Sequence, residues 1–136
     1  MKRYPTVFAT VDVVIRKGDQ LLLGRKAHQS KFRFVGGFAD PAFDNSYEDA
    51  AKREAKEETG IEVQTVKYLG STRIDDPRYR DTPDCIITHL FEATEWSGEP
   101  VASDDIAELK WFKRSELSAA DFVQEHHVLW ELLMPQ

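Results

Sequence analysis

The segment AAKREAKEETGI places three glutamates, Glu54, Glu57 and Glu58, close together. A helix turns by about 100° per residue, so all three fall within the apolar stripe of that helix, which is formed by Tyr47, Ala50, Ala51, Ala55 and Ile61. Carboxylates at positions i, i+3 and i+4 have Cβ atoms about 5–6 Å apart, so they repel one another, and partial burial strengthens the repulsion. Because hard cations such as Mg²⁺ and Mn²⁺ prefer oxygen ligands, this spacing indicates a divalent-metal site.

A different interpretation applies to the helix taken alone. Many solvated helices carry such charges, and Arg53 and Lys56 would then pair with neighbouring acids for roughly a few tenths of a kcal/mol each. The surroundings favour the metal site, because the glycine pair Gly36 and Gly37 lies just upstream and a T-G-I terminator follows the helix.

The helix that must position the glutamates has clear ends. Ser46 is a favourable N-cap, with Asp49 three residues later, and Gly60 ends the helix. Before it, KFRFVGGFAD alternates aromatic and polar residues, which predicts a short strand that ends in a loop at Gly36 and Gly37. Glycines there let the backbone bend or approach another group closely.

β-Branched and apolar runs predict the strands around this helix. Two of them, joined by the turn RKGDQ, form an opening hairpin, and the polar segment DDPRYRDTPD separates two later strands. The expected strands span residues 6–15, 21–26, 63–74, 85–96 and 107–112, and an amphipathic helix spans Asp121 to Leu133, with Phe122, Leu129, Trp130 and Leu133 facing inward. Mixed strands around two helices predict a layered α/β or α+β domain.

Composition limits the function classes that fit this chain. Its 136 residues suit one domain, 1–136, with a substantial core. The formal net charge of −6 argues against a surface that gathers nucleic-acid backbones, so we expect no nucleic-acid partner. The single cysteine excludes an internal disulfide, and no apolar run approaches the roughly 20 residues that span a bilayer. We therefore expect a cytoplasmic protein without a membrane segment.

The segment GGFADPAFDNSYEDAAKREAKEETGI resembles the Nudix box, G-x5-E-x7-R-E-U-x-E-E-x-G-U, in which U is a bulky aliphatic residue. Its second half matches closely at Arg53, Glu54, Ala55, Glu57, Glu58, Gly60 and Ile61, although Ala55 is smaller than usual. The first half departs, because Asn45 stands at the position of the first glutamate and Ala39 at that of the first glycine. The glycine pair lies two residues further upstream, which indicates a two-residue insertion in ADPAFDNS. Either Glu48 or Asp44 is a possible replacement for the missing glutamate.

The resemblance covers nearly the whole chain and implies a mixed-sheet α/β/α sandwich, the Nudix fold. It also implies a Mg²⁺-dependent hydrolase, with Mn²⁺ as a possible substitute, that cleaves a nucleoside diphosphate linked to another group. Glu54, Glu57 and Glu58 are the implied metal ligands, and Arg53 would orient the glutamates through ion pairs. The general base is either a box glutamate or a later acid. ASDDIAELKWF offers Asp104, Asp105 and Glu108, of which Asp105 matches the late acid of MutT-type members best.

Phosphate binding calls for cationic side chains, and guanidinium groups bind phosphate bidentately. The candidates are Arg25, Arg33, Arg73, Arg78 and Arg80, with the backbone at Gly36 and Gly37 approaching the substrate. The stretch IDDPRYR is similar to the R-D-P-R segment of ADP-ribose-cleaving Nudix enzymes, although an Asp-Pro turn with solvated arginines explains it equally well. His126 and His127 are expected to pack or face solvent rather than bind metal.

These features predict a Mg²⁺-dependent pyrophosphohydrolase that acts on a small nucleotide substrate, with ADP-ribose or a related dinucleotide favoured. The alternatives are a house-cleaning nucleoside triphosphate pyrophosphatase and a non-catalytic Nudix domain that senses a ligand. A homodimer is a possible assembly, because dimers are frequent among the ADP-ribose-cleaving members.

Overall fold

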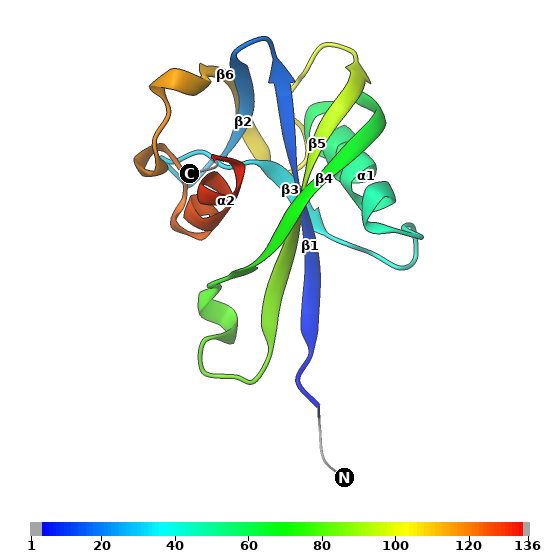
Figure 1. Cartoon of the computed structure of the whole chain (residues 1–136), viewed down its shortest axis with the longest axis vertical. Coiled ribbons are helices and arrows are strands. Elements are labelled where there is room, and N and C mark those ends of the chain that lie inside the picture. Colours follow the sequence, from blue (N-terminus) through cyan, green and yellow to red (C-terminus); the bar gives the residue numbers. More distant parts are fainter. Residues whose placement is uncertain (1–3, 135–136) are drawn as a thin grey trace.

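The computed structural model describes residues 4–134, in which six strands form one mixed sheet (Figure 1). Its strands follow the order β4-β5-β1-β2-β6, and β3 pairs with β1 off this path. Strand β1 runs parallel to β5 and antiparallel to β2 and β3. The strands are β1 (Val7–Lys17), β2 (Gln20–Lys26), β3 (Val35–Phe38), β4 (Glu62–Ile74), β5 (Cys85–Ser97) and β6 (Ile106–Lys113). The two helices are α1 (Tyr47–Thr59) and α2 (His127–Leu133), and short 3₁₀ turns are η1 (Pro77–Tyr79), η2 (Arg114–Glu116), η3 (Ala119–Asp121) and η4 (Gln124–His126).

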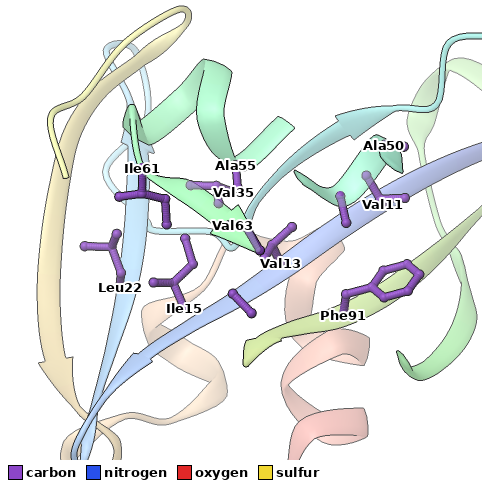
Figure 2. Packing of buried hydrophobic residues seen from close by; sticks show 12 residues of the cluster. Val11, Val13, Ile15, Leu22, Val35, Ala50, Ala55, Ile61, Val63 and Phe91 are labelled. Carbon is purple, nitrogen blue, oxygen red and sulfur yellow. The ribbon is translucent and has the colours of Figure 1, made fainter. Parts of the chain in front are cut away.

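The alternation of side chains along β1 supplies two cores, one on each face of the sheet. Val11, Val13 and Ile15 join the core beneath α1 (Figure 2), together with Ala50, Ala51, Ala55, Ile61 and Phe91. Val14 instead joins the core beneath α2, together with Phe34, Ile86, Leu90, Phe122 and Leu129. The predicted α/β/α sandwich is confirmed, with α1 and α2 on opposite faces.

Helix α1 has the ends that its sequence predicts. The Ser46 side chain accepts a hydrogen bond from the Asp49 N–H (3.1 Å), and Gly60 takes a left-handed conformation at φ 76°. The apolar stripe is narrower than expected, because Tyr47 is exposed and stacks on His89 of β5 instead of entering the core.

The predicted C-terminal helix from Asp121 is wrong over its first half. Turns η3 and η4 occupy this stretch, and α2 begins only at His127. The cause is a long-range contact, because the Phe32 N–H donates to the Asp121 carbonyl and the Val123 N–H donates to the Phe32 carbonyl. Of the four residues expected to face inward, Phe122, Leu129 and Leu133 are buried and Trp130 is half-buried. Neither helix of the described chain has the length and apolar character needed to cross a membrane.

Candidate active site

The glycine pair lies inside β3 rather than in a loop, which corrects the prediction from sequence. The Gly36 N–H donates to Glu58 Oε1 (2.8 Å). A Cβ atom on Gly37 would lie 2.7 Å from the Glu54 carboxylate, and one on Gly36 would lie 2.0 Å from the Val11 carbonyl oxygen. Both positions need glycine because these groups approach the backbone so closely.

Helix α1 places its three glutamates differently from the expected common stripe. Glu54 and Glu58 are buried, whereas the Glu57 side chain is 45% exposed, so the expectation of an inward Glu57 is wrong. Arg53 lies beside two of these glutamates. Its guanidinium donates to Glu54 (3.1 Å) and Glu57 (3.1 Å), which are the ion pairs that the resemblance implied.

Asp44, in the loop before α1, is the third carboxylate that contacts Arg53. Its carboxylate accepts from Arg53 Nε (2.9 Å) and Nη2 (2.8 Å), and its side chain is only 4% exposed. This bidentate contact lowers the pKa of Asp44. Of the two candidates for the missing first glutamate, Asp44 contacts Arg53, whereas Glu48 is exposed.

A second acidic segment reaches Glu58 from the loop before β6. The Ser103 N–H donates to the Glu58 carbonyl (3.1 Å), which ties this loop to the end of α1. Carboxylate oxygens of Glu58, Asp104 and Asp105 consequently lie within 4.8 Å of one another. Asp105 also pairs with Lys26 of β2 at 3.2 Å.

The pKa shifts show that full ionisation of this acidic cluster of Glu58, Asp104 and Asp105 is unfavourable. Burial, together with the adjacent Asp105, raises the pKa of Glu58 to about 8 despite the hydrogen bond from the Gly36 N–H. Partial burial opposes a shift at Asp105, but hydrogen bonds to Glu58 and Lys26 lower its pKa. Carboxyl groups crowded in this way suit a divalent cation, because a cation replaces the proton that the pair must otherwise share. The donor set therefore fits Mg²⁺ or Mn²⁺, with Glu54 beside it on Gly37.

A cleft of about 460 Å³ opens beside the acidic cluster on the α2 face of β3. Its lining includes Glu58, Asp105, both glycines and two of the predicted phosphate-binding arginines, Arg33 and Arg78. The Arg33 Nε–H is buried and lacks a hydrogen-bond partner within residues 4–134. Arg33 also lines the cleft, where its guanidinium offers a cationic group to a phosphate.

The remaining predicted arginines lie elsewhere. Arg25 is bound to Glu108 on β6 (2.9 Å), and neither residue lines the described part of the cleft. Arg80 is bound to Asp75 (2.9 Å) at a separate hollow, where Arg73 also lies. The structure thus gives no positional support to the substrate-binding roles predicted for Arg25 and Arg80.

Arg78 forms one rim of the cleft. Its guanidinium pairs with Asp76 (2.8 Å) and lies 5.8 Å from the centre of the Phe38 ring and 5.5 Å from that of Tyr79. Both Arg78 and Phe38 are exposed, and each offers a flat surface to a base. Phe34, the other aromatic near the glycines, is a core residue instead.

The floor of the cleft contains Asp12 and His126, and Thr88 lies behind Asp12; sequence reasoning did not connect these three residues. The Thr88 hydroxyl donates to the Asp12 carboxylate, and His126 Nε2 lies 3.5 Å from Asp12 Oδ1. His126 Nδ1 accepts from the Phe34 N–H (3.1 Å). All three side chains are at least nine-tenths buried. A lone acid in the apolar run TVDVVI was a signal available in the sequence.

A larger hollow of about 600 Å³ lies on the α1 side, between the first half of β1 and the loop before α1. Its described lining includes Val7, Ala9 and Pro41 but none of the acidic cluster. Size alone therefore does not mark the candidate site, and the chemistry assigns it to the smaller cleft.

Comparisons with known proteins agree on the family of this fold. The NUDIX domain model matches residues 7–133. A curated relative named NAD-capped RNA hydrolase NudC, from Pseudomonas putida strain F1, is 30% identical over 120 residues, which are 86% of this chain and 40% of the relative. The chain thus spans about 40% of the length of the first curated relatives that it matches.

Solved structures share the fold across nearly the whole chain. The E. coli ORF135 protein superposes with a TM-score of 0.77 at 25% identity, covering 96% of this chain and 90% of that one. A MutT NUDIX hydrolase from Burkholderia pseudomallei superposes with a TM-score of 0.79 at 19% identity, covering 95% and 99% of the two chains.

Proposed function

This chain belongs to the Nudix family, and we propose that it is a pyrophosphohydrolase that cleaves the diphosphate linkage of ADP-ribose or of a related dinucleotide such as NADH. One observation carries the proposal. Glu58 and Asp105 of the acidic cluster line the same cleft as Arg33. A diphosphate bridged to a cation meets both needs at once, because it supplies acceptors to arginine and counter-charge to the cation.

In this proposal some side chains bind the cation, and another keeps those side chains in position. Glu58, fixed by the Gly36 N–H, and Glu54, seated on Gly37, would hold a divalent cation together with Glu57. When bound, such a cation neutralises the diphosphate and makes water more acidic. Arg53 keeps Glu54 and Glu57 at a fixed separation through its ion pairs. That rigidity supports the in-line geometry that attack on phosphorus requires.

Asp105 is the candidate general base of the site. It lies on the exposed side of the acidic cluster, and its lowered pKa keeps it ionised at neutral pH. An ionised carboxylate accepts a proton from a water molecule placed between it and the substrate. Lys26, paired with Asp105 at 3.2 Å, fixes its orientation.

Two features support a dinucleotide over a nucleoside triphosphate. The curated relatives carry the name NAD-capped RNA hydrolase, and NAD contains two nucleosides joined by a diphosphate. The cleft also extends beyond the phosphate-binding end to the Phe38–Arg78 rim, where a flat base finds an aromatic and a guanidinium face.

A substrate panel with metal controls tests this function. Release of phosphate through a coupled phosphatase would be measured for ADP-ribose, NADH, NAD-capped RNA, nucleotide sugars and nucleoside triphosphates, with Mg²⁺, Mn²⁺ or EDTA. We expect metal-dependent cleavage of the dinucleotides, with turnover lost in Glu58→Gln and kept in Glu116→Gln, a matched change at a distant turn. Tight binding without cleavage of any compound would instead identify a ligand sensor.

A further inference from the structure

A buried acidic residue, Asp12, borders the cleft in which the diphosphate is proposed to bind. Asp12 lies on β1, on the same face of the strand as Thr10 and Val14. It faces the α2 side and borders the cleft beside Gly36. A carboxylate repels phosphate but accepts hydrogen bonds from hydroxyl and amino groups. Its burial therefore calls for a ligand group that donates, rather than for a phosphate.

The Asp12 carboxylate has unused capacity for such a donor. One oxygen accepts from Thr88, while the other has His126 Nε2 at 3.5 Å, which is beyond ordinary hydrogen-bond length. His126 cannot turn away, because its Nδ1 accepts the Phe34 N–H and its ring stacks on Phe34 at 5.9 Å. The imidazole is neutral, since burial lowers its pKa to about 3, so Nε2 carries the proton and faces Asp12. The carboxylate is thus held in place from two sides and incompletely satisfied.

The distance from the acidic cluster restricts which part of a nucleotide can reach Asp12. Gly36 touches both carboxylates, because its N–H donates to Glu58 and a Cβ atom on it would lie 2.8 Å from Asp12 Oδ1. Asp12 and Glu58 are therefore separated by the width of one residue. In a nucleotide the group that follows a phosphate at this distance is the sugar, and the base lies further away.

We propose that Asp12, held by Thr88 and His126, accepts a hydrogen bond from a ribose hydroxyl of the substrate and makes the cleft selective for ribonucleotides over their deoxy counterparts. The inference rests on the proposed function for the placement of the diphosphate at Glu58. A site built to bind a substrate hydroxyl rejects an analogue that lacks it, because the buried acceptor is left unpaired. Selectivity of this kind also separates a dinucleotide substrate from deoxynucleoside triphosphates.

Binding measurements test the inference independently of hydrolysis. Isothermal titration with Ca²⁺, in place of Mg²⁺, would compare ADP with 2′-deoxy-ADP and 3′-deoxy-ADP for the adenosine half. Ribose 5-phosphate would be compared with 2-deoxyribose 5-phosphate for the other half. The wild type is expected to bind the ribose member of at least one set about 10- to 100-fold more tightly. The set that shows the preference identifies which ribose lies on Asp12.

Variants distinguish hydroxyl binding from a purely structural role of Asp12. Asp12→Ala and Thr88→Val should reduce the ribose-to-deoxyribose preference toward one, while affinity for the deoxy compounds stays near the wild-type value. Glu92→Gln, on β5 and paired with Arg16 away from the cleft, should keep the preference. A wild type that binds ribose and deoxyribose compounds equally, or binds none of them, overturns the inference. Equal losses for both kinds of compound in the variants overturn it too, because they indicate structural support alone.

These outcomes remain separate from the test of the proposed function. A protein that shows the ribose preference but cleaves nothing retains the hydroxyl site and loses the hydrolase proposal. A protein that cleaves ADP-ribose and its deoxy analogues at equal rates retains the hydrolase proposal and loses the hydroxyl site.

Discussion

Replacing Gly37 with alanine should damage the metal site while leaving the fold intact. The new Cβ atom would lie 2.7 Å from the Glu54 carboxylate, and ordinary van der Waals contact begins at 3.4 Å, so the carboxylate must move by about 0.7 Å. Glu54 cannot make this movement freely, because it is buried and ion-paired with Arg53. Misplacement of a catalytic group by about 1 Å costs on the order of 100-fold in rate, so we expect turnover to fall about 10- to 100-fold.

The neighbouring glycine supplies a contrast within the same strand. A Cβ atom on Gly36 would lie 2.0 Å from the Val11 carbonyl oxygen, and a paired backbone cannot move aside as a side chain can. Gly36→Ala should therefore destabilise the protein by about 1–3 kcal/mol or more and lower Tm by several degrees. Gly24→Ala, in β2, is the matched control and should cost less, because its Cβ atom would meet only side-chain atoms, the nearest being Ile106 Cδ1 at 3.2 Å.

Calorimetric unfolding and Mn²⁺ titration of the three variants would separate these effects. Gly37→Ala should keep a Tm close to that of the wild type and bind Mn²⁺ more weakly. Wild-type Mn²⁺ affinity and turnover in Gly37→Ala would refute the idea that this glycine exists to seat Glu54. A loss of Tm as large as that of Gly36→Ala would refute it as well.

Three further substitutions test individual carboxylates. Glu57→Gln should cut turnover about 100-fold or more. Its Tm should be almost unchanged, because Glu57 is exposed and its loss leaves no buried group unpaired. Normal turnover would show that Glu57 is not a metal ligand. Asp105→Asn should lower turnover and change the pH–rate profile, whereas an unaltered profile would exclude Asp105 as the base. Burial raises the pKa of Asp12 to about 7, so the wild type loses stability as pH rises through that value and Asp12 ionises. Asp12→Asn lacks this loss. In urea unfolding it should therefore gain on the order of a few kcal/mol relative to the wild type between pH 4 and pH 8. His126 acts in the opposite direction in both proteins and cancels in that difference, so a pH-independent difference would show that Asp12 is not desolvated.

The helix and its caps could be predicted because their causes are local. Ser46 and Gly60 act on the backbone within one turn, and the fixed offsets from Arg53 to Gly60 identify the box without any tertiary contact. The positions of Arg53 and Glu57 could not be predicted from a helical wheel, because the wheel gives only a direction from the helix axis. Asp44 lies nine residues before Arg53 and draws the arginine toward the glutamates, and this contact exists only once the intervening loop has folded.

The contacts among Asp12, Thr88 and His126 could not be predicted from the sequence for a related reason. Asp12 and Thr88 lie 76 residues apart and meet because β1 and β5 run parallel, a pairing that no local pattern specifies. His126 joins them because Phe122 and Val123, between the turns η3 and η4, are extended and pair with Phe32 instead of continuing a helix. Local propensity predicts a helix there, and the long-range backbone hydrogen bonds override it.

The shortness of β3 explains how groups from both faces of the sheet reach one ligand. Helix α1 packs on the face of β1 that carries Val11 and Val13, whereas the cleft lies on the opposite face with Asp12. A longer β3 with ordinary side chains would separate the helix from the cleft. Strand β3 has only four residues, and two of them are glycines, so Glu54 and Glu58 approach its backbone from the helix side and Asp12 approaches Gly36 from the β1 side. At this glycine pair, the acidic cluster on one side and the buried carboxylate on the other therefore come within reach of the same nucleotide.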